Sequence, residues 1–210
     1  MSDIITFAPD TLIGGYRRFR EGRFAQEQAH YAALAEGQQP HTLVIACSDS
    51  RVEPAAIFDC APGELFVVRN VANLVPVPET GGGLHGVSAA LEFAVKVLKV
   101  RGVLVLGHGA CGGVKACAHG LGDLDTDYLA DWVAQMNPAR AEAVSQIGEG
   151  EALPAHLELV SIKHSVERLK AFPFVAEAME TYGLEIHGAR FSIADGSLEW
   201  LGADGSFAPV

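Results

Sequence analysis

Three short apolar runs and one alternating stretch, separated by segments with helical periodicity, constrain the fold of this chain more than any other feature. The apolar runs are residues 42–46, 64–69 and 102–106, and runs of this length bounded by turn-forming residues are typical of buried strands. Residues 184–191 alternate in character and predict a fourth strand. Residues 84–99 carry apolar side chains at helical i, i+3, i+4 spacing. Strands that alternate with helices predict an α/β domain with a mostly parallel central β-sheet of about four to five strands, flanked by helices.

Helical patterns also precede and follow these strands. Residues 10–36 predict an N-terminal helical arm, and residues 123–182 predict further helices with breaks at glycine and proline. Near the C-terminus, Asp195-Gly196 is a hairpin signal, and we expect residues 197–201 to form an edge strand. The chain therefore contains enough regular structure for one α/β domain with a helical extension.

Charge and composition exclude several classes of partner. The chain has 26 acidic and 15 basic residues, a net charge of −11, and a groove for nucleic acid needs clustered lysine and arginine instead. No apolar run approaches the roughly 18–20 residues of a membrane span, and the N-terminus lacks the pattern of a secretory signal. Four cysteines suit metal binding in a reducing compartment, so we expect a cytoplasmic protein.

Chemically active side chains follow two of the predicted strands. Cys47, Asp49 and Arg51 come directly after strand 42–46, and His108 and Cys111 lie in the glycine-rich turn after strand 102–106. Ligands of open α/β sheets bind beyond the carboxyl ends of the strands. If the two strands belong to one parallel sheet, Cys47, His108 and Cys111 converge on one zinc ion per chain.

Such a site resembles a catalytic zinc centre, because three protein ligands leave the fourth position open for water. Two thiolates and a neutral imidazole cancel the charge of the ion, so the water is less acidified than at an all-histidine site. Asp49 can accept a hydrogen bond from that water and orient it, or coordinate zinc as a fourth ligand in a closed state. Arg51 can hold Asp49 off the metal through a bidentate pair; alternatively the two form an ordinary turn ion pair.

Two other interpretations of the same residues remain open from the sequence. Residues 107–112 match the G-x-G-x-x-G dinucleotide fingerprint, but the acidic residue expected about 20 positions later does not follow an apolar strand. Cys47 and Cys111 could also serve thiol redox chemistry, although the chain contains no C-x-x-C. For Cys60 and Cys117 we expect roles in core packing.

Three linked motifs resemble those of the β-class carbonic anhydrases, in particular the plant-like branch with bacterial members. They are residues 46–52 (ACSDSRV), 68–73 (VRNVAN) and 107–113 (GHGACGG). The resemblance implies zinc on Cys47, His108 and Cys111 with Asp49 and Arg51 as the catalytic dyad. It also implies reversible hydration of carbon dioxide to bicarbonate and a proton, through attack of zinc-bound hydroxide on the carbon.

The resemblance further implies an obligate homodimer, often paired into tetramers, with the active site at the subunit boundary. Gln38, Phe66, Phe93 and Gly112 match positions of the substrate pocket, with Phe93 where this branch carries tyrosine. The implied single domain of residues 1–210 is divided into three parts: a helical arm (1–37), a zinc-binding core (38–120), and helices with C-terminal edge strands (121–210).

Some members of this family bind bicarbonate at a regulatory site built from a tryptophan, a valine and an arginine. Val52 and Arg69 match two of these positions, but Val44 stands in place of the tryptophan. We therefore hypothesise that this chain lacks such control. The alternative functions are a zinc hydrolase of carbon disulfide or carbonyl sulfide on the same fold, and a non-catalytic zinc scaffold.

Overall fold

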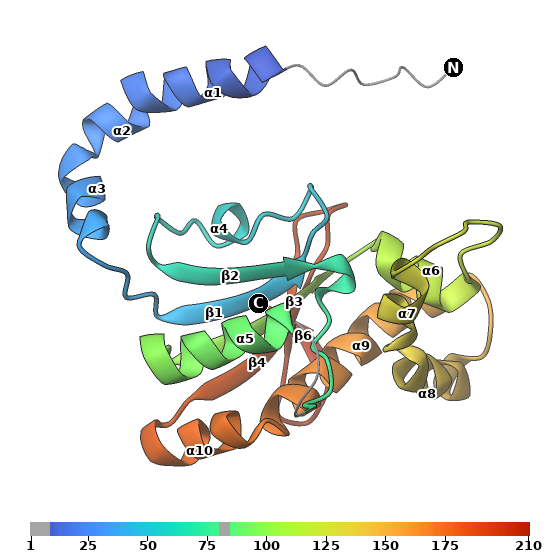
Figure 1. The fold of residues 1–210 in the computed structure, drawn as a ribbon. Coiled ribbons are helices and arrows are strands. Elements are labelled where there is room, and N and C mark those ends of the chain that lie inside the picture. Colours follow the sequence, from blue (N-terminus) through green and yellow to red (C-terminus); the bar gives the residue numbers. More distant parts are fainter. Residues whose placement is uncertain (1–8, 80–84) are drawn as a thin grey trace. The chain divides into compact units, whose positions relative to one another are not determined.

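The computed structural model describes residues 9–79 and 85–210 and divides the chain into two units, residues 1–38 and 39–210. The first unit contains α1 (Pro9–Glu21), α2 (Arg23–Gln26) and α3 (Gln28–Ala35), which confirms the N-terminal helices (Figure 1). In this unit the rings of Phe19 and Phe24 pack on Tyr31, at centroid distances of 5.7 and 5.0 Å. The spacing of Leu12, Tyr16, Phe19 and Phe24 along the predicted arm could place all four on one apolar face, but Leu12 and Tyr16 are exposed.

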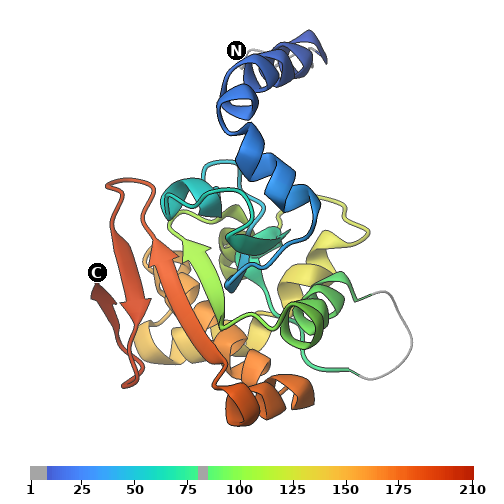
Figure 2. The same ribbon diagram turned by 90° about the vertical axis from the view of Figure 1, so that its left-hand side faces the viewer.

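The second unit is built on a six-stranded sheet, so the mostly parallel α/β fold is confirmed and the strand count exceeds the prediction (Figures 1 and 2). The strand order is β2-β1-β3-β4-β5-β6; β1, β2, β3 and β4 pair in parallel, and β5 and β6 are added antiparallel. The strands are β1 (Thr42–Cys47), β2 (Leu65–Asn70), β3 (Gly102–His108), β4 (Glu185–Phe191), β5 (Leu198–Leu201) and β6 (Phe207–Pro209).

Two strand predictions need correction. The strand predicted at residues 197–201 is not at the edge, because the three-residue β6 pairs with it; so short a strand containing Pro209 has no clear periodic signal. The run at 64–69, predicted as a buried strand, forms β2, which is half-buried along its whole length. The physical reason is its place at the edge of the sheet, where β1 is the one strand among the described residues that pairs with it.

Helices follow most of the strands, and several begin at a proline. The prolines at 54, 138, 154 and 173 occupy the first turn of a helix, where the missing N–H is tolerated. The helical segments are α4 (Pro54–Ile57), η1 (Val71–Asn73), α5 (Gly86–Glu92), η2 (Phe93–Leu98), α6 (Gly112–His119), α7 (Leu129–Ala134), α8 (Asn137–Ile147), α9 (Leu153–Lys170) and α10 (Pro173–Tyr182).

The helix predicted over residues 84–99 is divided in the structure. It is α-helical in α5 and continues as a π-helical turn, η2, which ends at Lys99 in the left-handed conformation. Leu84, the first apolar residue of this predicted helix, and the glycines at 81–83 that precede it lie outside the described residues. The apolar positions Leu91, Ala94 and Val95 are buried as expected.

Helix α9 packs closely against β3 and β4 because two strand residues there are glycines. A Cβ at Gly107 would lie 2.6 Å from Cδ1 of Ile162, and a Cβ at Gly188 would lie 2.7 Å from its Cγ2. Ile162 is fully buried between them. This contact brings α9 against the strand ends, where the functional side chains gather (Figure 1).

Candidate metal centre

Three potential metal ligands meet at the carboxyl ends of two adjacent parallel strands. Cys47 is the last residue of β1, His108 is the last residue of β3, and Cys111 is the N-cap of α6. Their ligand atoms lie within 4.8 Å of one another, and the two Sγ atoms are 3.9 Å apart. All three side chains are buried, with at most 5% exposed. Two sulfurs and one nitrogen at this spacing form a donor set that zinc prefers.

The imidazole of His108 is oriented with one nitrogen toward this cluster. Its Nδ1 lies 2.9 Å from the carbonyl oxygen of Gly109, so Nδ1 carries the hydrogen and donates it. Nε2 therefore has a lone pair, and among the described residues this buried atom has no hydrogen-bond partner. A buried polar atom without a partner is costly, and a bound metal ion would satisfy it.

The two thiols cannot both ionise easily without a cation between them. The Cys111 thiol, as hydrogen-bond donor, lowers the pKa of Cys47 from 9.0 to about 4 against the effect of burial. The Cys47 sulfur in turn raises the pKa of Cys111, and burial adds to this rise. The backbone N–H groups of Gly113 and Val114 favour the Cys111 thiolate only partly. A divalent cation supplies the missing positive charge, so the residues fit zinc.

Asp49 lies beside the cluster and is held by Arg51. Nε of Arg51 donates to Oδ1 of Asp49 at 2.9 Å, and Nη2 donates to Oδ2 at 2.7 Å. This bidentate pair holds the pKa of the Asp49 carboxyl well below its usual range. Oδ2 of Asp49 is 3.9 Å from Nε2 of His108. The carboxylate therefore stands next to the centre as an ionised acceptor, with both oxygens bound to Arg51.

Arg69 organises the loop that carries Cys47 and Asp49. Its guanidinium donates to the carbonyl oxygens of Cys47, Asp49 and Val52 at 2.9, 2.6 and 3.2 Å, and it also pairs with Glu53. The sequence places Arg69 in the motif 68–73 and at one position of a regulatory anion site that we expect this chain to lack, without indicating these contacts. An arginine on a neighbouring strand that binds backbone carbonyls leaves no spacing signal in the sequence, because its partners are not side chains.

Sequence reasoning also missed Glu158, on α9, which is buried against the turn that carries Cys111. Its Oε1 accepts a hydrogen bond from the backbone N–H of Cys111 at 3.2 Å, and its Oε2 accepts one from Nε of Arg190 at 2.8 Å. A charged residue on the mostly apolar buried face of a helix is the one sequence signal that could have indicated it.

The four predicted pocket residues are not all brought to the centre of their own chain. Gly112 is next to Cys111, and a Cβ there would meet no atom within 4 Å, so the space is open. Phe66 pairs in register with Leu43, four residues before Cys47, about 13 Å along the strand. Its ring stacks on Phe93 at 5.9 Å. Gln38 is the last residue of the first unit, whose position relative to the metal centre is not determined.

The glycines of the turn have structural roles that do not depend on a dinucleotide. Gly107 allows the close approach of Ile162, and Gly109 lies against the guanidinium of Arg190. The turn also presents His108 and Cys111 to the buried cluster. Cys117 is half-buried and packs against the core around Val114, and Cys60 is half-buried beside Phe58. The geometry thus favours a metal loop.

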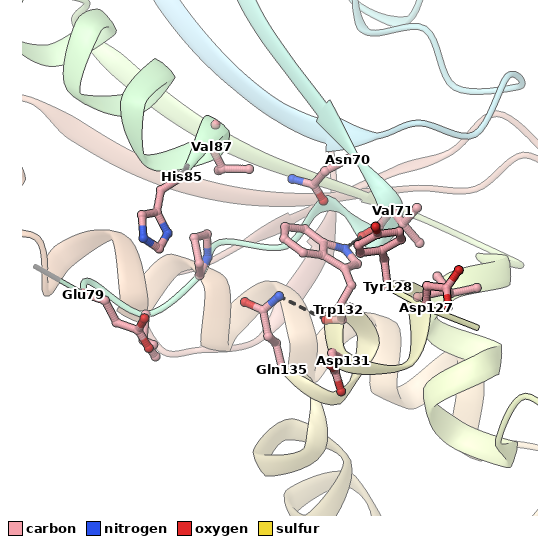
Figure 3. Close-up of a pocket in the computed structure, with 14 residues that line it drawn as sticks. Asn70, Val71, Glu79, His85, Val87, Asp127, Tyr128, Asp131, Trp132 and Gln135 are labelled. Carbon is pink, nitrogen blue, oxygen red and sulfur yellow. Dashed lines mark hydrogen bonds between the residues drawn. The ribbon is translucent and has the colours of Figure 1, made fainter. Parts of the chain in front are cut away.

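A separate cavity of about 830 Å³ lies beyond the end of β2 (Figure 3). Trp132 forms one wall and donates from Nε1 to the carbonyl oxygen of Val71 at 2.8 Å. Val77, Tyr128 and Gln135 also line it. The lining includes neither the Cys-His-Cys cluster nor Asp49 and Arg51, so this cavity is not the candidate metal centre.

The Cys-His-Cys cluster fits a zinc site and lies at the carboxyl ends of a mostly parallel sheet, which places the chain among α/β proteins with a candidate metal centre. The family model described as "Carbonic anhydrase" matches residues 42–198, and the chain belongs to this family, in its β class. The chain is 38% identical over 193 residues to beta carbonic anhydrase 5, chloroplastic, of Arabidopsis thaliana, covering 90% of this chain and 64% of that protein. It is 36% identical to a carbonic anhydrase of Pseudomonas aeruginosa, covering 90% and 86%.

Solved structures of the same class have the same fold. The β-carbonic anhydrase CcaA superposes with a TM-score of 0.89 at 29% identity, covering 96% of this chain and 98% of that one. A tetrameric β-carbonic anhydrase of Sordaria macrospora superposes with a TM-score of 0.81 at 29% identity, covering 92% and 96%. No helix within residues 9–79 and 85–210 has the length and apolar character needed to cross a membrane.

Proposed function

We propose that this chain catalyses the reversible hydration of carbon dioxide to bicarbonate and a proton. One zinc ion per chain is held by Cys47, His108 and Cys111. When bound, zinc supplies a Lewis acid that makes water a nucleophile near neutral pH. The proposal is carried by one observation: the unpartnered Nε2 of His108 faces two thiols, with the Asp49 carboxylate 3.9 Å away.

Asp49 acts in this proposal as a hydrogen-bond acceptor. Because Arg51 keeps its pKa well below the usual range, the carboxylate stays ionised at neutral pH and is too weak a base to keep a proton. It orients the attacking water by accepting one of its hydrogens, which points an oxygen lone pair at the carbon of the substrate. Arg51 holds the carboxylate by two hydrogen bonds and so keeps it from coordinating the metal as a fourth ligand.

The apolar part of the pocket is completed by a second copy of the chain. Phe66 and Phe93 form a stacked pair, but they lie toward the opposite end of the strand from Cys47. Phe93 and Val97 are 42% and 63% exposed on the same helical segment, which is unusual for large apolar side chains unless another surface covers them. We propose that in a homodimer the phenylalanines and Gln38 of one protomer line the pocket of its partner.

A homodimer, alone or paired into a homotetramer like the tetrameric relative, is the functional unit. The helical arm (1–37), the zinc-binding core (38–120) and the C-terminal segment (121–210) together form its single domain. The substrates are carbon dioxide and bicarbonate; no nucleic acid takes part. The free thiols of the site suit the cytoplasm.

A hydrolase of carbon disulfide or carbonyl sulfide would use the same residues and is the alternative within zinc chemistry. A non-catalytic zinc scaffold is the alternative outside it. A scaffold would not need the bidentate Asp49–Arg51 pair or the open space beside Gly112. The presence of both favours an enzyme.

The test is stopped-flow hydration of carbon dioxide by purified protein with its zinc quantified. We expect fast hydration with one zinc per chain, loss of activity after chelation, and recovery when zinc is added back. Full zinc without hydration would contradict the proposal. Turnover of carbonyl sulfide or carbon disulfide by the same sample would then identify the hydrolase, and no turnover of any substrate would identify the scaffold.

A further inference from the structure

Glu158 is a buried carboxylate that the proposed reaction does not use. Its side chain is only 3% exposed, and a buried charge is costly unless it is paired and hydrogen-bonded. The structure supplies both conditions. Oε1 accepts from the backbone N–H of Cys111, and Oε2 accepts from Nε of Arg190. The Glu158 carboxylate therefore links the backbone of Cys111, a predicted zinc ligand, to the side chain of Arg190 on β4.

Arg190 extends this connection across the sheet. From β4 its Nη1 donates to Oε2 of Glu199 on β5 at 3.0 Å, so one guanidinium joins two carboxylates. It also supports the turn directly, since a Cβ added at Gly109 would lie 3.2 Å from its Nη2. The backbone N–H of Gly109 donates to the carbonyl oxygen of Phe191 at 2.8 Å. The turn between His108 and Cys111 thus rests on β4.

Arg51 of the proposed catalytic pair also contacts this turn. Nη2 of Arg51 donates to the carbonyl oxygen of Ala110 at 3.2 Å, and Ala110 has a left-handed φ of 56°. A non-glycine residue in this conformation is strained and persists only where its surroundings hold it. Glu158 holds the residue that follows, Cys111, by its N–H. Arg190, Arg51 and Glu158 therefore lie against Gly109, Ala110 and Cys111, the turn that leads to the Cys111 thiol.

We propose that Glu158, oriented by Arg190, is a positioning residue for the metal centre. It fixes the backbone of Cys111 so that the thiolate meets Cys47 and His108 at the spacing that zinc requires. Through Arg190 and Glu199 it also connects the centre to the C-terminal strands. This inference rests on the proposed zinc site, and it assigns to Glu158 a role in holding the metal, not in the chemical step.

The experiment compares Glu158→Ala and Glu158→Gln with Glu142→Gln. Glu142 is the matched control, because it forms an ion pair at 2.7 Å with His164, which lies on the same helix α9 as Glu158. Within the described residues no hydrogen bond or ion pair joins Glu142 to the metal centre. Zinc affinity is measured by competition with a chelator, and the cobalt-substituted proteins are compared by their thiolate-to-metal absorption bands. These bands report ligand geometry, which a merely structural residue would not change.

We expect Glu158→Ala to lower zinc affinity by about 10- to 100-fold and to shift the cobalt bands. Glu158→Gln, which keeps an acceptor oxygen but faces Arg190 with an amide, should give a smaller loss in the same direction. Glu142→Gln should leave both readouts as in the wild type. If Glu158→Ala does not fold, Glu158→Gln decides the question.

Two results would overturn the inference, and they are distinguishable. If the Glu158 variants bind zinc as tightly as Glu142→Gln and keep the wild-type cobalt spectrum, Glu158 does not position Cys111, although the zinc site stands. If the wild-type protein itself gives no thiolate-to-cobalt bands, the zinc site is wrong and the inference falls with it.

Discussion

Both carboxylate oxygens of Asp49 accept hydrogen bonds from the guanidinium of Arg51, and the backbone N–H of Arg51 adds a third bond to Oδ1 at 3.0 Å. The two residues are only two positions apart, so the pair forms within one turn. Asp49 is 18% exposed and stands at the edge of the buried cluster. Arg51 thus fixes the orientation of both Asp49 oxygens, and whether the carboxylate can coordinate the metal depends on these hydrogen bonds.

Replacement of Arg51 by alanine should lower carbon dioxide hydration on the order of 10²-fold while zinc stays at one per chain. The physical reason is that an unclamped carboxylate loses its orientation, and small misplacements of a positioned group have effects of this size. Stopped-flow rates with zinc analysis measure both quantities. Lys170→Ala, which removes an exposed ion pair with Glu167, is the control, and a wild-type rate in Arg51→Ala would contradict the role of the pair.

In the zinc-free, reduced protein the two buried thiols should ionise far apart in pH. The lowered pKa of Cys47, about 4, predicts one thiolate well below pH 9, while burial raises the pKa of Cys60 and Cys117. Ultraviolet absorbance of the thiolate during a pH titration measures this. Cys111→Ala removes the hydrogen-bond donor, so the early ionisation should move to higher pH.

The lowered pKa of Cys47 also predicts how the stability of the zinc-free protein depends on pH. Because the folded pKa of Cys47 lies below its unfolded value of 9.0, its ionisation stabilises the fold fully above pH 9, and this contribution is lost as the pH falls toward 4. The raised pKa of Cys111 has the opposite sign and destabilises the fold above its unfolded value. Denaturant unfolding at several pH values tests this, and a flat profile between pH 5 and 9 in wild type and Cys111→Ala alike would contradict it.

Because α9 packs closely on the sheet, alanine substitutions at two different glycines should differ in their effect on the free energy of unfolding. Gly188→Ala should destabilise the zinc-loaded protein by about 1–3 kcal/mol, because its Cβ would lie 2.7 Å from Ile162 and 3.2 Å from Leu201. Gly102→Ala is the control, since its nearest neighbours are at 3.9 Å. Chemical unfolding at equal protein concentration compares them. Equal stability of the two variants would show that α9 can move away from the sheet at little cost.

Arg69 should act as a structural residue and not as a bicarbonate sensor. Its guanidinium is engaged by three backbone carbonyls and Glu53, and Val44, where a regulatory site would need tryptophan, is buried in the core. Arg69→Met should therefore weaken zinc retention together with activity. In the wild type we expect no cooperative, bicarbonate-dependent loss of activity below pH 8; such a loss would refute the hypothesis.

The sequence was informative wherever local pattern and chemistry coincide. The apolar runs predict β1 and β3, and the alternating stretch predicts β4, to within one residue at most ends. Strands β1 and β3 are buried almost throughout, and a strand buried on both faces needs apolar side chains along its whole length. The positions of Cys47, His108 and Cys111 after such strands predict that they meet, since parallel neighbours end at one edge. The structure brings these three side chains together.

The sequence was uninformative where a contact depends on distant partners. Arg69 binds main-chain oxygens, and Glu158 reaches Cys111 from a helix 47 residues further along the chain, so neither forms a spacing motif. The edge position of β2 and the short β6 depend on strand order, which single-strand patterns do not contain. The location of Phe66 and Phe93 away from their own centre likewise appears only in the register of β1 and β2.

The most direct test of the central claim is the rate of carbon dioxide hydration by Asp49→Asn at full zinc occupancy. Asparagine keeps the size of the side chain but replaces one acceptor oxygen by a donor and removes the charge that pairs with Arg51. We predict one zinc per chain and near-complete loss of hydration relative to the wild type. A zinc-loaded Asp49→Asn protein that hydrates carbon dioxide at the wild-type rate would contradict the account.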